Sequence, residues 1–231
     1  ERFSKGKSLG ILDGVPVSVK DELDMLPFKT MIGTKFYSKK PPEQDATSVA
    51  RLRSAGALMV GKTNMHEIGL GVTGLNIQCG TTRNPHHLDH YPGGSSSGSA
   101  AAVAAGLSPI ALGCDGGGSI RIPASLCGVV GLKTTWGRIS SAGSAPLHWS
   151  IGSVGPITST SLDAAITYSF LAGPDTRQSC TQNQPAVDLK NIENTNLEGV
   201  KLGIFYSWFN HASEDVVKCC EQMLNSFKSQ G

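Results

Sequence analysis

Short apolar strands alternate with helices along this chain, and that alternation limits its fold more than any other feature of the sequence. Apolar periodicity, capping residues and glycine stops predict strands at residues 14–20, 57–60, 109–112 and 200–205 and helices at residues 45–55, 97–105, 160–171 and 213–227. This order is typical of an α/β domain, in which helices cover a central sheet. The chain has 231 residues, enough to bury a core of its own. We therefore expect a single α/β domain over residues 1–231.

The C-terminal end of the sequence suggests that this domain is a fragment. After the last predicted helix an α/β pattern needs another strand, but the chain ends at Ser229-Gln230-Gly231. At the other end, Glu1 is not an initiator methionine. We expect a partial copy of the fold that lacks its C-terminal part.

Charge, hydropathy and cysteine usage narrow the function. The formal net charge is +2 and no run of Lys or Arg occurs, so we expect no nucleic-acid partner. No stretch reaches the roughly 18 consecutive apolar residues of a membrane-spanning helix. The six cysteines form no C-x-x-C pair, which favours a reduced intracellular protein. The expected location is cytoplasmic or membrane-associated.

Residues 56–63 match the phosphate-binding loop pattern G-x-x-x-x-G-K-[ST] letter for letter. That loop needs a strand before it and an open backbone whose N–H groups face phosphate. Here a predicted helix precedes the match, and its middle residues are apolar and typical of a strand. We therefore reject nucleotide binding at this position.

Residues 94–98 match G-x-S-x-G, the turn that carries the nucleophilic serine of α/β-hydrolases, with Ser96 at its centre. That turn needs a strand running directly into it, and residues 84–93 contain too many turn-forming residues to be one. Such a hydrolase also needs a later histidine, and neither His148 nor His211 lies in a distinctive sequence setting. This interpretation stays open but is the weaker one.

Two glycine- and serine-rich segments belong to a longer and more specific pattern. The first is Gly93-Gly94-Ser95-Ser96-Ser97-Gly98-Ser99, and the second is Asp115-Gly116-Gly117-Gly118-Ser119. Upstream of both, Gly14-Val15-Pro16-Val17-Ser18-Val19-Lys20 reads as a strand that ends on a lysine. Together, at this spacing, the three segments resemble the signature of the amidase signature family, which are serine hydrolases with a Ser-Ser-Lys triad.

The resemblance covers about residues 10–175. Further segments that look like those of the family are residues 62–67, 82–85, 131–134 and 155–175. Within the family, the run Asn64-Met65-His66-Glu67, with Gly71, Thr73 and Gly74, looks most like the plant-type fatty acid amide hydrolases. The resemblance implies the amidase signature fold, a mixed central β-sheet covered by helices.

By this resemblance Ser119 is the nucleophile, Ser95 the bridging serine and Lys20 the base. A serine hydroxyl is a weak nucleophile until a neighbouring group removes its proton. Lys20 must be uncharged to take that proton through Ser95, and burial behind an apolar strand favours the uncharged amine. The resemblance also implies a cis peptide bond between Gly94 and Ser95.

The glycines before Ser119 suit a site for the negatively charged oxygen of a tetrahedral intermediate. Backbone N–H groups without side chains around them can converge on that oxygen. The expected donors are the N–H groups of Gly116, Gly117, Gly118 and Ser119. The residues expected to support this loop from behind are Ser96, Asp115 and Arg121, the last two through charge-assisted hydrogen bonds.

Neither a metal ion nor a cofactor is expected. His86, His87, Asp89 and His90 gather in one loop, but that loop is rich in turn residues and no second cluster of ligands accompanies it. Cys114 lies near the predicted nucleophile. It is expected to be a small buried residue and not a reactive thiol.

These observations predict a serine amidohydrolase that cleaves the C–N bond of a carboxylic amide, specifically a fatty acyl amide, through an acyl-enzyme on Ser119. Two alternatives stay open. One is a glutaminase like the A subunit of glutamyl-tRNA amidotransferases, and the other is a fragment that keeps the motifs but is catalytically incomplete. The expected partner is a small-molecule amide substrate. A homodimer and a peripheral association with a membrane are left open.

Overall fold

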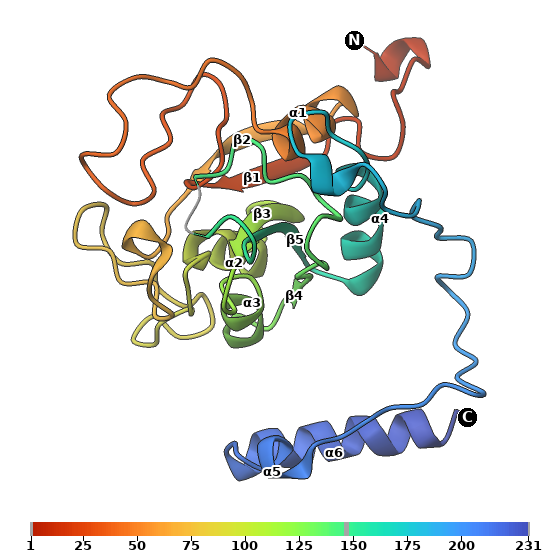
Figure 1. Cartoon of the computed structure of the whole chain (residues 1–231). Coiled ribbons are helices and arrows are strands. Elements are labelled where there is room, and N and C mark those ends of the chain that lie inside the picture. The colour runs from red at the N-terminus through yellow and green to blue at the C-terminus, as the bar shows by residue number, and fades with distance from the viewer. Residues whose placement is uncertain (1, 146–147, 231) are drawn as a thin grey trace. The chain divides into compact units, whose positions relative to one another are not determined.

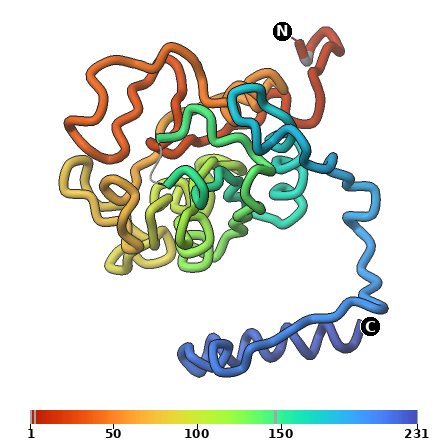
Figure 2. The backbone as a smooth tube through the Cα atoms, viewed as in Figure 1, coloured from red at the N-terminus to blue at the C-terminus, as the bar shows by residue number. Residues whose placement is uncertain are grey.

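The computed structural model describes residues 2–145 and 148–230 of the chain (Figures 1 and 2). The chain divides into two compact units, Glu1–Leu189 and Lys190–Gly231. The first unit contains every strand of the described chain and all of the predicted site residues. That both units belong to one domain stays a prediction.

A five-stranded mixed sheet forms the centre of the first unit (Figure 1). In spatial order its strands are β2 (Leu58–Thr63), β1 (Pro16–Lys20), β3 (Ile110–Asp115), β5 (Ser153–Thr158) and β4 (Val130–Gly131). β1 is parallel to β2 and β3, whereas β5 is antiparallel to β3 and β4. Parallel neighbours end at the same edge, so the last residues of β1 and β3 meet there. The predicted mixed α/β fold is confirmed.

The sequence does not predict β5, because Gly155 and Pro156 are residues that weaken a strand. In the structure this strand pairs along its whole length with β3, and Gly155 lies opposite Gly113. A Cβ atom on Gly155 would lie 2.1 Å from the carbonyl oxygen of Leu132. The glycine is therefore needed for the close approach of two backbones, which no local pattern reveals.

Helices complete the described chain. The α-helices are α1 (Thr47–Ser54), α2 (Ser97–Ala104), α3 (Arg121–Leu126), α4 (Ser161–Leu171), α5 (Tyr206–Phe209) and α6 (Glu214–Lys228), and the 3-10 helices are η1 (Phe3–Lys5), η2 (Glu67–Gly69) and η3 (Ser179–Thr181). The predictions of α1, α2, α4 and α6 are confirmed. α4 starts at a side-chain cap, where Thr160 Oγ1 accepts a hydrogen bond of 3.1 Å from the Asp163 amide. α3 is too short to show an apolar period in the sequence.

Helices cover both faces of the sheet (Figure 1). On one face, α1 and α4 pack with a core cluster that includes Val19 and Leu112. On the other face, α2 packs on a smaller cluster with Ala111 and Ile157. Side chains alternate along a strand. Lys20 therefore points away from the Val19 cluster, toward the segment that leads into α2.

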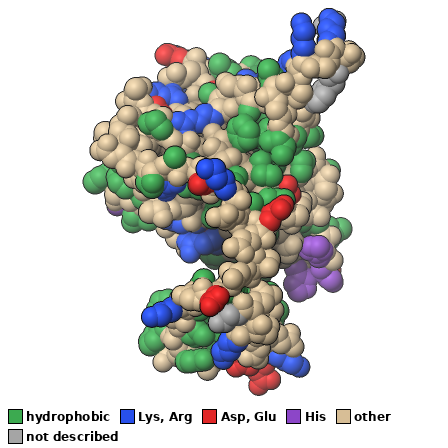
Figure 3. All heavy atoms as spheres, turned by 90° about the vertical axis from the view of Figure 1, so that its right-hand side faces the viewer, with side chains coloured by type: hydrophobic (Ala, Val, Ile, Leu, Met, Phe, Trp, Pro, Cys, Tyr) green, Lys and Arg blue, Asp and Glu red, His purple; other side chains and the backbone are tan. Residues whose placement is uncertain are grey.

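The second unit contains α5 and α6. The predicted strand at residues 200–205 is wrong, because the described part of this unit offers no other strand with which that segment could pair. Instead its apolar residues line a pocket together with three residues of α6, Leu224, Phe227 and Lys228. None of the described residues of this unit is buried, and apolar side chains reach the surface of both units (Figure 3). Within the described residues, no helix has the length and apolar character needed to cross a membrane.

Replacing Leu112 by Ala is expected to lower the free energy of unfolding by about 2–5 kcal/mol, because a buried leucine leaves a cavity behind. The side chain is 0% exposed and belongs to the larger core cluster. Leu107→Ala is the matched control. Leu107 is 73% exposed, so its replacement should change stability by less than about 0.5 kcal/mol. Urea denaturation followed by circular dichroism measures both variants, and equal effects would contradict this assignment of the core.

Candidate active site

Three segments of the first unit carry Lys20, Ser95 and Ser119 to one edge of the sheet. Lys20 is the last residue of β1, Ser95 lies shortly before α2, and Ser119 follows β3 in the loop that leads to α3. Lys20 and Ser95 are 0% and 1% exposed, whereas Ser119 is partly open to solvent. The Gly94–Ser95 peptide bond is cis, as expected. The site thus combines a buried amine with a hydroxyl that a substrate can reach.

The amino group of Lys20 meets three oxygen atoms. Its Nζ donates to Ser95 Oγ at 2.8 Å and to the carbonyl oxygen of Cys114 at 3.2 Å. Glu22 Oε2 lies 2.7 Å from the same nitrogen, close enough for an ion pair. This contact is not a hydrogen bond, and no described residue donates one to Glu22 Oε2. Lys20 is therefore joined to the predicted bridging serine on one side and to a buried carboxylate on the other.

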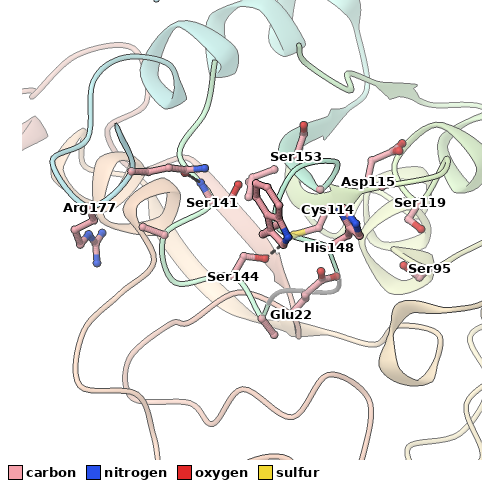
Figure 4. A pocket seen from close by; sticks show the side chains of 17 residues that line it. Glu22, Ser95, Cys114, Asp115, Ser119, Ser141, Ser144, His148, Ser153 and Arg177 are labelled. Carbon is pink, nitrogen blue, oxygen red and sulfur yellow. Dashed lines mark hydrogen bonds between the residues drawn. The ribbon is translucent and has the colours of Figure 1, made fainter. Parts of the chain in front are cut away.

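Ser95 and Ser119 belong to two loops that a backbone hydrogen bond joins. The Ser96 amide donates to the carbonyl oxygen of Ser119 at 3.1 Å. Both hydroxyls line one cavity (Figure 4), although among the described contacts no hydrogen bond links them directly. Catalytic hydrogen bonds are often long or poorly aligned until a substrate binds. The geometry thus supplies the Lys20–Ser95 half of the predicted proton path before any substrate is present.

The carboxylate of Asp115 organises the glycine loop. Its oxygens accept hydrogen bonds from the backbone amides of Gly118, Ile120 and Arg121 at 2.8, 3.0 and 3.3 Å. The guanidinium of Arg121 adds a two-pronged contact at 3.1 and 3.0 Å. Burial alone would raise the Asp115 pKa, but these donors together lower it. Its contribution to stability is therefore present above the pKa of the unfolded chain and is lost as the pH falls through the lower folded value.

The contact with Asp115 changes the expected role of Gly118. Its N–H points at the carboxylate and is engaged there. Gly118 has a φ of +134°, and a Cβ atom at this position would lie 2.5 Å from Ile122 Cδ1. Gly118 is therefore needed to shape the loop. Donation to an oxyanion by Gly116, Gly117 and Ser119 stays a prediction.

Ser96 has the supporting position that the sequence analysis gives it. It is 0% exposed, and its hydroxyl donates to the Cys114 carbonyl at 3.4 Å. It does not belong to the lining of the cavity. A nucleophile must reach its substrate, so the geometry argues against the α/β-hydrolase interpretation, in which Ser96 would attack.

The cavity beside Ser119 has a volume of about 240 Å³. Figure 4 shows side chains from the sheet edge on one side and from a later segment on the other. Several of its lining residues were not among the predicted site residues, namely Glu22, Ser141, Ser144, His148, Trp149, Arg177 and Gln178. One signal was available for Glu22, which lies two residues after Lys20. The others come from residues 141–178, where no local pattern marks them.

Two smaller predictions, on Cys114 and on the phosphate-loop match, are also answered by the structure. Burial raises the pKa of the Cys114 thiol to about 12, so Cys114 is the unreactive buried residue that was expected. Residues 58–63 form β2, so the phosphate-loop match is a strand and not an open loop. His86 Nε2 contacts the Cys127 carbonyl oxygen at 2.9 Å. Among the described residues, no three His, Cys, Asp or Glu side chains are arranged to hold a metal ion.

Comparison with known proteins places this geometry in a family. The family model described as "Amidase" matches residues 1–231. A fatty acid amide hydrolase of Oryza sativa subsp. indica is 44% identical over an alignment of 231 positions that covers 97% of this chain and 38% of the relative. The crystal structure of the glutamyl-tRNA(Gln) amidotransferase A subunit from Thermotoga maritima superposes with a TM-score of 0.89 at 37% identity, covering 95% of this chain and 49% of that one.

The native peptide amidase of Stenotrophomonas maltophilia superposes with a TM-score of 0.76 at 40% identity, covering 80% of this chain and 39% of that protein. The chain thus spans less than half the length of these three proteins. The match nevertheless includes the lysine strand, both serine segments and the glycine loop, because the family model extends over all of them. The chain belongs to the amidase family.

Proposed function

We propose that the protein is a serine amidase that breaks the C–N bond of a carboxylic amide through an acyl-enzyme on Ser119. The observation that carries this proposal is the 2.8 Å hydrogen bond between Lys20 Nζ and Ser95 Oγ, at the base of a cavity that Ser119 also lines. A buried amine in contact with a serine has the arrangement that a proton relay needs. Membership of the amidase family supports the same chemistry.

The reaction follows from these positions. Uncharged Lys20 takes a proton from Ser95 while Ser95 takes one from Ser119, and the oxygen of Ser119 attacks the amide carbon. Backbone N–H groups of the glycine loop stabilise the oxyanion that forms. The proton returns along the same path to the leaving nitrogen as the C–N bond breaks. Water then hydrolyses the ester on Ser119 and frees the serine.

The proposed substrate is a fatty acyl amide. The support is the 44% identity with a protein named fatty acid amide hydrolase, over 97% of this chain. A second candidate is a glutaminase, since the superposition with the amidotransferase protein has a TM-score of 0.89 over 95% of the chain. An inactive partial fold is the third alternative. A homodimer, peripheral membrane association and a cytoplasmic or membrane-associated location are further proposals.

Ser119→Ala is expected to abolish turnover and covalent labelling by a fluorophosphonate probe, because both require the attacking hydroxyl. Peptide mapping of the labelled intact protein locates the modified serine. Ser125→Ala removes a hydroxyl from an exposed position of the neighbouring helix α3 and should leave labelling unchanged. If Ser96→Ala abolished labelling while Ser119→Ala did not, the proposed nucleophile would be wrong.

Lys20→Ala is expected to reduce amide turnover by several powers of ten, because activation of the nucleophile and protonation of the leaving amine both pass through Lys20. Ester hydrolysis should fall less, since its leaving group needs less protonation. Lys20→Arg should not restore activity, because a guanidinium stays charged and cannot accept a proton. The control is Lys29→Ala at an exposed position. Near-native amide turnover by Lys20→Arg would show that Lys20 supplies charge and does not move protons.

Turnover is expected to rise with the length of the acyl chain and then level off. A hydrophobic acyl site gains about 0.8 kcal/mol per buried CH₂, which is at most about fourfold in kcat/KM for each added methylene. Rates for straight-chain amides from two to sixteen carbons, with glutamine beside them, measure this. A flat profile contradicts the fatty acyl proposal, and faster turnover of glutamine would favour the glutaminase.

A further inference from the structure

Glu22 is a buried carboxylate beside the triad whose position is fixed by the fold. Its carbonyl oxygen accepts a hydrogen bond of 2.9 Å from Ala145, and the Lys20 carbonyl accepts one of 3.0 Å from Leu23. The side chain is 7% exposed and lines the cavity with Ser95 and Ser119 (Figure 4). A carboxylate in such a place is costly unless a partner compensates its charge.

Other charged or titratable groups around the site have partners of their own or carry no charge. Asp115 on β3 is paired with Arg121, and Lys62 on β2 lies 3.4 Å from Asp21. The neighbouring Cys114 thiol has its pKa raised to about 12 by burial, so it is neutral at ordinary pH. Also at the cavity, His148 Nδ1 contacts Ser150 and Arg177 lies beside Asp175. Lys20, at 2.7 Å, is therefore the group that Glu22 faces among the described residues.

The contacts of Lys20 fit two arrangements of one proton. As an ammonium group it has three N–H bonds, of which two are donated to Ser95 Oγ and the Cys114 carbonyl and the third remains for the ion pair with Glu22. Once it has given Glu22 a proton, the uncharged amine has two N–H bonds and one lone pair, and rotation about the Cε–Nζ bond turns that lone pair toward Ser95, from whose hydroxyl it can accept. The second arrangement is the one that a base requires. At 2.7 Å the two heavy atoms are already within proton-transfer distance, and rotation about the Cε–Nζ bond of Lys20 is enough to aim an N–H at Glu22 Oε2.

We propose that Glu22 is a positioning residue that shares one proton with Lys20 and holds that proton while Lys20 acts as the base. The Lys20 ammonium transfers a proton to the Glu22 carboxylate, which leaves an uncharged amine beside a carboxylic acid. The pair is neutral overall before and after the transfer. The amine then receives the Ser119 proton through Ser95 and returns it to the leaving nitrogen. Glu22 keeps its own proton throughout.

This inference rests on the proposed function, in which Lys20 is the base, and it makes a prediction of its own about pH. When the pair holds two protons, at low pH, Lys20 is charged and inactive. Loss of one proton from the pair makes the active arrangement available, so the acid limb of the activity profile belongs to the pair and not to one residue. Without Glu22, the same amine must release its proton to solvent, which requires a higher pH.

The test measures the rate of fluorophosphonate labelling of the intact protein against pH, since labelling reports activation of Ser119 without protonation of an amine. Glu22→Gln is expected to shift the acid limb of this profile to higher pH by about one unit or more. Glu43→Gln makes the same change at a side chain that is 92% exposed, and its profile should match the native one. Thermal unfolding checks that each variant is folded.

Two results would overturn the proposal. In the first, the acid limb of Glu22→Gln shifts to lower pH, which would mean that Glu22 is a fixed anion that only keeps Lys20 charged. In the second, the acid limb is unchanged and the rate is reduced, which would mean that Glu22 contributes only packing to the site. If Glu22→Gln does not fold, Glu22→Asp decides the question. It should label more slowly with an acid limb within about half a unit of the native one, and a shift of a full unit would contradict shared protonation. Labelling that does not depend on Ser119 and Lys20 would instead refute the proposed function.

Discussion

The whole site depends on how the amino group of Lys20 is satisfied inside the protein. An ionisable nitrogen without water costs several kcal/mol, on the order of 3–5, unless its partners are in place. Lys20 is 0% exposed, and its partners Ser95, Cys114 and Glu22 come from the segment before α2, from β3 and from the turn after β1. The parallel pairing of β1 with β3 brings two of these together. Sheet, helix and cavity are thus arranged around one nitrogen.

Two buried carboxylates at this edge of the sheet have opposite surroundings. Asp115 receives three backbone amides and a guanidinium, so its charge is held and the glycine loop is rigid. Glu22 receives no hydrogen bond at Oε2 from the described residues and faces a single amine. Where environments separate two acids in this way, one serves structure and the other is free to exchange a proton. The carboxylate that organises the loop of Ser119 is thus a different one from the carboxylate that faces Lys20.

Similarity to proteins with different names indicates which part of the function this chain carries. It is 44% identical to a fatty acid amide hydrolase, 40% to a peptide amidase and 37% to a protein of a glutamyl-tRNA(Gln) amidotransferase. Sequence identities that lie so close together do not distinguish among three kinds of substrate. The feature that a fatty acyl amide, a peptide amide and glutamine share is the C–N bond, which is the bond that the proposed reaction of Lys20, Ser95 and Ser119 breaks. The matched region thus corresponds to the chemistry more than to the choice of substrate.

The sequence by itself determined the elements and residues whose signals are local. Strands β1, β2 and β3 and four helices follow from apolar patterns and caps. Lys20, Ser95 and Ser119 follow from the resemblance of three motifs to those of the amidase signature family. Only the tertiary structure decided the rest. β5 exists because β3 pairs with a Gly-Pro segment, and residues 200–205 form no strand because their unit, as far as the structure describes it, offers no partner. Glu22 matters because it lies 2.7 Å from Lys20 Nζ and because both side chains are buried. Both facts depend on the folded structure and cannot be read from positions along the chain.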